Sequence, residues 1–135
     1  MIKRSLIFVT VFSFFAVQAA VIDFEEYSKG KNPNTAFDTL VNSGKPTVVD
    51  FFFPWCGPCK ALAPIFEKVS NDFSGVVNFV KINIEKFESV ATRFKIRSGP
   101  TVLHFKNGQE LKNTRHHGVN NAGELRTLVK NNFGL

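Results

Sequence analysis

Apolar side chains recur along this chain in two rhythms, one typical of buried strands and the other of amphipathic helices. Runs of β-branched and aromatic residues predict three strands, at residues 47–53, 76–84 and 101–105. Apolar residues three or four positions apart predict four helices, at residues 37–44, 62–73, 87–94 and 121–133. From about residue 20 onward, strands and helices therefore alternate.

Two shorter segments complete this pattern. Residues 21–24 form a short apolar start. Asn107-Gly108 is a strong hairpin signal, and it predicts a further strand near residues 111–117. The early alternation indicates parallel strands joined by helical crossovers, and the late hairpin adds antiparallel strands. We therefore predict an α/β fold with a mixed central sheet and helices on both faces.

The first nineteen residues follow neither rhythm. Lys3 and Arg4 precede thirteen uncharged, mostly apolar residues, and Ala19 ends a small-residue pattern that fits a cleavage site. This arrangement predicts a secretory signal peptide at residues 1–19 and one domain at residues 20–135. An uncleaved membrane anchor is the alternative, although the apolar stretch is shorter than the roughly 20 residues that a spanning helix needs.

Composition and charge narrow the classes of function. The chain has 135 residues, of which 44% are hydrophobic and 21% charged, so it suits one globular domain and not a disordered chain. Lys and Arg number 17 against 11 Asp and Glu, which gives a net charge of +6, but the basic residues are scattered. We therefore expect no nucleic-acid binding.

A signal peptide implies export, and disulfides persist outside the cytoplasm unless something reduces them. We expect a periplasmic protein, with a secretory lumen or the extracellular space as alternatives. The chain has two cysteines, Cys56 and Cys59, and they lie in one motif. A structural disulfide would have to use both, so we attribute them to reactivity and not to stapling of the fold.

The cysteine motif lies between a predicted strand and a predicted helix. Cys56 and Cys59 are three residues apart, on one side of the first helical turn, and this separation can suit a disulfide. Helix N–H groups should favour the Cys56 thiolate and lower its pKa below the free value of about 8.5. A thiolate is the attacking species in thiol–disulfide exchange. Cys59, one turn into the helix, is suited to resolving the mixed disulfide.

A metal site is the first alternative for these cysteines, and two buried, inert cysteines are the second. Structural zinc takes about four ligands. The chain has no second cysteine pair, His116 and His117 are adjacent, and His104 falls within a predicted strand. We therefore expect no metal, and dithiol–disulfide exchange through the two cysteines needs no organic cofactor.

From about residue 35 onward the chain resembles the thioredoxin family. The resemblance rests on the sequence WCGPCK at residues 55–60, which is the family's active-site sequence in its reducing form, and on four further matches. These are the family's buried acid at Asp50, its cis-proline at Gly99-Pro100-Thr101, its buried lysine near the acid at Lys81, and its glycine after the last strand at Gly118. The resemblance implies a thioredoxin-like fold, Cys56 as the nucleophile and Cys59 as the resolving thiol of a redox-active disulfide.

Asp50 also has a case of its own, because it interrupts an otherwise apolar strand. Burial should raise its pKa, so that it could accept the proton of Cys59, directly or through a water molecule. A partly exposed carboxylate at the strand end is the alternative. Lys81 is expected to support Asp50 electrostatically, and an ordinary surface lysine is the alternative there.

The resemblance also implies a substrate-binding surface around the cysteines. By family analogy the loop at Pro100 faces the cysteines, and the backbone of residue 99 stays free to pair with an extended substrate segment. An ordinary strand-start proline is the alternative. Relatives usually carry a bulkier residue than Gly99, so we expect a wider groove here. The expected substrate-binding residues are Trp55, Gly57, Pro58, Gly99, Pro100 and Gly118.

The residues that flank the motif, 53–56 and 60–64, are also similar to those of protein disulfide isomerase domains. Those domains usually carry Gly-His between the cysteines and often Glu as the buried acid, whereas this chain has Gly-Pro and Asp. Within the family, Gly-Pro goes with more reducing behaviour. We therefore predict a protein-disulfide reductase, with a disulfide oxidase or isomerase and a non-catalytic peptide-binding module as the alternatives.

His117 is a further candidate, because a longer hairpin places it just before Gly118, near the family's substrate-binding edge. When protonated it could lower the pKa of Cys56, and a solvated loop histidine is the alternative. The expected partners are disulfide-bearing proteins and an electron-donating thiol reductase embedded in a membrane. We expect the protein itself to be a monomer.

Overall fold

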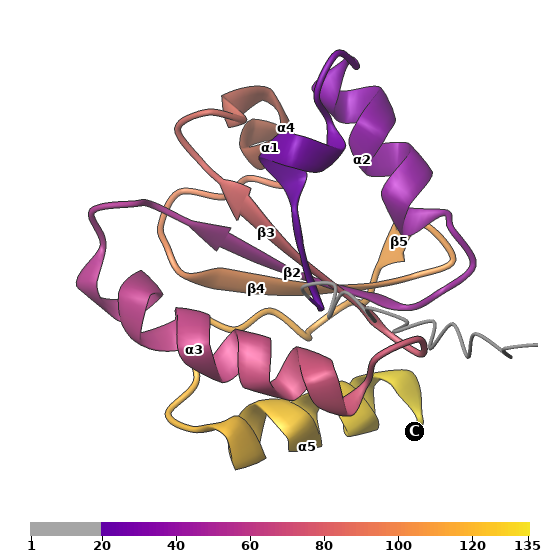
Figure 1. The fold of residues 1–135 in the computed structure, drawn as a ribbon, viewed down its shortest axis with the longest axis vertical. Coiled ribbons are helices and arrows are strands. Elements are labelled where there is room, and N and C mark those ends of the chain that lie inside the picture. The colour runs from indigo at the N-terminus through magenta and orange to yellow at the C-terminus, as the bar shows by residue number, and fades with distance from the viewer. Residues whose placement is uncertain (1–19) are drawn as a thin grey trace, which may run out of the picture.

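A five-stranded sheet runs through the middle of the structure, with helices on both sides of it (Figure 1). The computed structural model describes residues 20–135, so the signal peptide predicted at residues 1–19 lies outside the described residues. The strands follow the spatial order β1-β3-β2-β4-β5. Their bounds are β1 Val21–Asp23, β2 Thr47–Phe52, β3 Asn78–Asn83, β4 Thr101–Lys106 and β5 Gln109–Glu110.

The sheet is mixed. Strands β1 and β2 both pair with β3 in parallel, whereas β4 pairs antiparallel with β2 and with β5. The parallel pairs come from the early alternation of strands and helices, and the late hairpin accounts for the antiparallel pair of β4 with β5. The antiparallel pair of β4 with β2 arises instead because the chain reverses its direction between α4 and β4. The predicted α/β fold with a mixed sheet is therefore confirmed.

The helices form two layers, one on each face of the sheet (Figure 1). Helices α1, α2 and α4 cover one face, and α3 and α5 cover the other. Their bounds are α1 Phe24–Tyr27, α2 Pro33–Val41, α3 Gly57–Asp72, α4 Glu88–Arg93 and α5 Ala122–Phe133. Among the described residues, no helix is long and apolar enough to cross a membrane.

The strands feed two separate cores because successive side chains point to opposite faces. On β2, Val49 and Phe51 belong to the core under α2 and α4, whereas Val48 belongs to the core under α3 and α5. The same alternation on this strand sends Asp50 to the α3 face. Asp50, an acidic residue in an otherwise apolar strand, therefore points toward the same side of the sheet as the helix that begins at the cysteines.

Helix α1 was not predicted from the sequence. It is a single turn of four residues, too short to show a helical rhythm. Its start is fixed by Asp23, whose carboxylate accepts a hydrogen bond from the N–H of Glu25 at 3.0 Å.

The predicted strand at residues 111–117 is wrong in extent. Strand β5 covers only Gln109–Glu110, and the ladder returns for a single pair, Val102 with His116. Between these pairs, the two residues 103–104 on β4 face the five residues 111–115. The excess residues bulge away, with Asn113 at a φ of 60°. The hairpin signal at Asn107-Gly108 fixed the turn but carried no information about this bulge.

Candidate redox site

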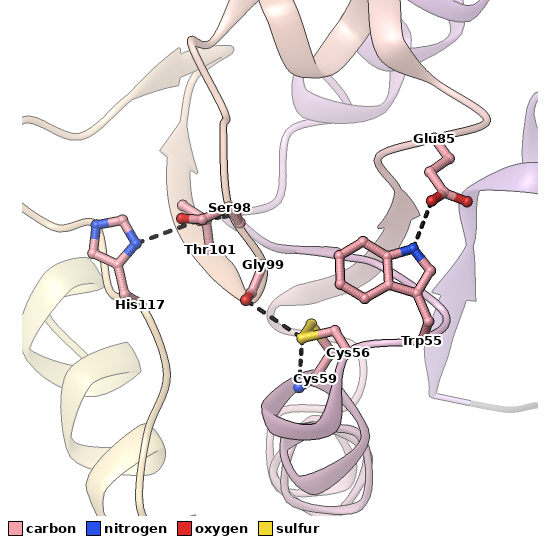
Figure 2. Close-up of a disulfide and its surroundings, with 8 residues drawn as sticks. All are labelled: Trp55, Cys56, Cys59, Glu85, Ser98, Gly99, Thr101 and His117. Carbon is pink, nitrogen blue, oxygen red and sulfur yellow. Dashed lines mark hydrogen bonds between the residues drawn. A yellow bond between two sulfur atoms is a disulfide. The ribbon is translucent and has the colours of Figure 1, made fainter.

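Cys56 and Cys59 form a disulfide at the start of α3, with their Cα atoms 5.2 Å apart (Figure 2). Helix α3 begins directly after Cys56, whose sulfur accepts a hydrogen bond from the N–H of Cys59 at 3.2 Å. Pro58 lies in the first turn, where the missing N–H has no intrahelical partner to lose. The helix N-terminus thus presents backbone N–H groups to the Cys56 sulfur, an arrangement that favours a thiolate.

The two cysteines differ little in exposure, at 7% for Cys56 and 4% for Cys59, but they face different surroundings. The Cys56 sulfur lies 3.4 Å from the carbonyl oxygen of Gly99, which belongs to the loop before β4 (Figure 2). Cys59, whose sulfur also borders the Gly99 loop, lines a cavity together with Asp50. The Cys56 sulfur therefore lies at the loop where a substrate is expected, and Cys59 shares a cavity with a buried acid.

The peptide bond between Gly99 and Pro100 is cis, as the family resemblance implied. Pro100 is buried, and a Cβ atom added to Gly118 would lie 3.8 Å from Cγ of Pro100. Gly118 itself has a φ of 132°, a backbone angle that residues with a side chain rarely adopt. Pro100 and Gly118 thus lie together beside the disulfide.

Gly99 does not leave a wider groove. A Cβ atom at this position would lie 3.0 Å from the Cys59 sulfur and 3.1 Å from Cδ2 of Phe53. The aromatic ring of Phe53 and the disulfide already occupy the space that a larger residue would use. The expectation of a wider groove is therefore wrong on this side of Gly99, because the Cys59 sulfur and Phe53 leave no open space where a side chain would begin.

Gly99→Ala is expected to destabilise the disulfide form by about 1–3 kcal/mol, the usual cost of overpacking. Gly57→Ala is the matched control, because a Cβ atom there meets nothing within 4 Å. Guanidinium denaturation of both oxidised variants measures the difference. Equal midpoints for the two variants would show that the Gly99 loop moves freely out of the way.

Asp50 is buried, at 4% exposure, so the alternative of a partly exposed carboxylate is excluded. Burial raises the pKa of Asp50 from its ordinary value near 3.8 to about 7. Within residues 20–135 its Oδ1 atom has no hydrogen-bond partner. The cavity that Asp50 and Cys59 both line has a volume of about 340 Å³, which is ample for water molecules. A proton could therefore travel between the thiol and the carboxyl group through water.

The expectation of a buried Lys81 is wrong. Its side chain is 45% exposed, and its Nζ atom lies 3.2 Å from Oδ2 of Asp23. Lys81 is the register partner of Asp50 and lines the same cavity, so it is near the acid but bonded elsewhere. Asp23 competes with Asp50 as the partner of Lys81. The one sequence signal for this was the position of Asp23 at the short apolar start of the chain's first strand.

Trp55 projects from the loop before α3, with 67% of its surface exposed. Its ring stacks on Phe53 with centroids 4.8 Å apart. Figure 2 shows its Nε1–H donating to Glu85 at 2.6 Å. Gly57 is exposed beside it, as is Pro58. Sequence reasoning missed both Phe53 and Glu85 as supports of this indole, because nothing in the chain links Glu85 to a residue 30 positions earlier.

His117 is exposed, and its ring points toward Thr101 with an Nδ1 to Oγ1 distance of 3.5 Å (Figure 2). The hydrogen bonds of the described residues link His117 to Thr101 and not to Cys56. The suggested influence of His117 on Cys56 stays a hypothesis.

Within residues 20–135, no group of three or more His, Cys, Asp or Glu side chains could hold a metal ion.

Comparison with known proteins yields a consistent set of relatives. The family model described as thioredoxin matches residues 29–131. A thioredoxin-like protein of Synechocystis is 41% identical over 88 residues, which cover 65% of this chain and 82% of that protein. A chloroplastic M-type thioredoxin of Spinacia oleracea is 41% identical over 78 residues, which cover 58% of this chain and 43% of that protein. The chain thus spans less than half the length of this plant relative.

A solved structure of a thioredoxin variant from Halobacterium salinarum has the same fold. Its TM-score is 0.66 at 24% sequence identity, and the match covers 75% of this chain and 86% of the other. At this level of identity the likeness concerns the fold alone, and it agrees with the mixed five-stranded sheet described above.

Proposed function

Because this chain belongs to the thioredoxin family, we propose that it is a thiol–disulfide oxidoreductase that reduces disulfides in other proteins. The observation that carries the proposal is the disulfide itself. Cys56 and Cys59 are joined at a helix N-terminus, with the Cys56 sulfur 3.4 Å from the Gly99 carbonyl oxygen and Cys59 on a cavity that it shares with a buried acid.

The first half of the proposed reaction begins at Cys56 in the reduced protein. Its thiolate attacks one sulfur of a substrate disulfide, which forms a mixed disulfide and breaks the substrate's S–S bond. The departing substrate sulfur leaves as a thiolate and takes a proton from solvent. Trp55, Gly57 and Pro58 surround the attack site with exposed surface, and the backbone at Gly99 and Pro100 can pair with an extended substrate segment.

The second half begins at Cys59. Its thiol gives its proton to the ionised Asp50 carboxylate across the cavity, and the resulting thiolate attacks the Cys56 sulfur. This step forms the Cys56–Cys59 disulfide and releases the second substrate sulfur. Two electrons have then passed from the protein to the substrate. A pKa near 7 suits this role for Asp50, since the group can both hold and release a proton at neutral pH.

The reducing direction is supported by Gly57-Pro58 between the cysteines. We expect the protein to catalyse the reduction of insulin by dithiothreitol, and to have a reduction potential near about −270 mV against glutathione or thioredoxin standards. A potential near about −120 mV would instead identify an oxidant. Failure to reduce insulin, with partner binding unchanged in a Cys56→Ser and Cys59→Ser double variant, would identify a non-catalytic binding module.

We also propose that the protein acts outside the cytoplasm, in a periplasm, on disulfide-bearing proteins. The support is the charge and apolar pattern of residues 1–19. In that compartment the spent disulfide needs a dithiol donor, for which a membrane-embedded thiol reductase is the simplest source, and the protein itself would act as a monomer. Fractionation of cells that express the full chain tests the location, and recovery only in the cytoplasm would contradict it.

A further inference from the structure

Three charged residues lie side by side across adjacent strands, on the sheet face that α3 covers. Lys81 on β3 is the register partner of Asp23 on β1 and of Asp50 on β2. Register partners on neighbouring strands point to the same face of a sheet. All three residues also line the cavity that Cys59 borders. In the strand register, Lys81 therefore lies between the two acidic residues.

The ammonium group is bonded to the outer carboxylate. Lys81 Nζ lies 3.2 Å from Asp23 Oδ2, and both side chains are about half-exposed. Asp50 takes part in no ion pair among residues 20–135, and its Oδ1 atom has no hydrogen-bond partner there. Burial alone accounts for the raised pKa of Asp50. Lys81, the cation nearest to Asp50 in the strand register, therefore does not neutralise the Asp50 carboxylate.

The remaining charged groups at this cavity come from α3. Lys60 and Glu67 line it from the exposed side of that helix, and Cys59 lines it from the helix start. Lys60 and Glu67 make no ion pair among the described residues. Of the charged side chains described around the cavity, Asp23 and Lys81 are therefore the pair held in a fixed arrangement.

We propose that Asp23 is a positioning residue for the disulfide exchange: it holds the Lys81 ammonium group over the outer part of the cavity and keeps this cation away from Asp50. The proposal rests on the proposed function, because it concerns the proton acceptor of that reaction. An ammonium group beside Asp50 would favour the charged carboxylate and make it a weaker base. With Lys81 bound to Asp23, Asp50 stays a better acceptor for the proton of Cys59.

Asp23→Asn is the informative substitution. Asp23 also caps α1 through its side-chain oxygen, and asparagine keeps that acceptor while removing the charge. The readout is the titration of Asp50, followed by carboxyl-carbon NMR on the oxidised protein at low ionic strength. We expect its midpoint to fall by about one pH unit or more, because the freed Lys81 turns toward Asp50.

A second background separates the two ways in which Asp23 could act. If Asp23 acted only through its own negative charge, Asp23→Asn would shift the midpoint of Asp50 by the same amount with or without Lys81. Because we propose that Asp23 acts by holding Lys81, we expect Asp23→Asn to leave the midpoint of Asp50 nearly unchanged in a Lys81→Met background. A shift of equal size in both backgrounds, or no shift in either, would overturn the proposal.

Asp38→Asn is the matched control, since it removes a half-exposed carboxylate from an ion pair with Arg93 on the opposite face of the sheet. We expect no change in the Asp50 titration for this variant. The titration needs no substrate and no electron donor. A protein that failed to reduce insulin would refute the proposed function, whereas only the Asp50 titrations decide the role of Asp23.

Discussion

Replacing Asp50 with asparagine is expected to stabilise the protein increasingly as the pH rises, by about 4 kcal/mol more at pH 8 than at pH 4. The reason is the cost of an isolated charge in a buried place. Burial moves the pKa of Asp50 from near 3.8 to about 7. At about 1.4 kcal/mol per pH unit, that difference corresponds to about 4 kcal/mol.

The sign of this effect follows from where the proton is bound. The folded protein keeps the proton on Asp50 up to a pH of about 7, whereas the unfolded chain releases it near 3.8. Between these values the folded state binds more protons, so the stability of the parent protein falls as the pH rises. Below both values the carboxyl group is neutral in both states, and the pH-dependent advantage of the variant disappears.

Guanidinium denaturation of the oxidised proteins at several pH values measures this difference directly. Asp38→Asn again provides the comparison, because that carboxylate is half-exposed and bonded to Arg93. A constant offset between Asp50→Asn and the parent from pH 4 to pH 8 would mean that water reaches the carboxylate and that the buried acid is not destabilising.

Removal of either cysteine is expected to abolish catalysis, but the two variants should fail at different steps. Cys56→Ser removes the proposed nucleophile, so insulin reduction should fall to the rate without protein. Cys59→Ser keeps the attacking thiolate and loses the resolving thiol, so a mixed disulfide should accumulate on Cys56.

A small aromatic disulfide makes this difference countable. Each molecule of reduced parent protein should release two thionitrobenzoate ions from one molecule of dithiobis-nitrobenzoate. Each molecule of Cys59→Ser should release only one, because the other stays bound to Cys56 as a mixed disulfide. The double variant should release none. A retained adduct on Cys56→Ser in place of Cys59→Ser would reverse the roles assigned to the two cysteines.

Local sequence carried a large part of the fold and of the site. The run at residues 47–53 indicated a strand because β-branched and aromatic residues suit a buried sheet, and β2 covers Thr47–Phe52. The position of Cys56 at a helix start followed from the apolar helical rhythm after it, and the burial of Asp50 followed from the apolar strand around it. These features depend on neighbours within about one turn or one strand.

The parts that could not be predicted depend on contacts between distant segments. Lys81 has two carboxylates within reach of its strand position, and only the folded sheet shows that Asp23 is its partner. The space beside Gly99 is filled by Phe53, which lies in another loop. The bulge after β5 depends on how residues 111–115 cross back to β4. Periodicity along the chain contains none of this information.

The short edge strands of the sheet affect how readily another extended chain can pair with this protein. Among the described strands, the edge strands β1 and β5 have three and two residues, so each offers only a short row of unpaired backbone groups. Long open borders invite other chains to add on and start aggregates. In the reductase role proposed above, the protein would meet extended, partly folded chains, and its short edge strands limit how many backbone hydrogen bonds such a chain can form along the edge of the sheet.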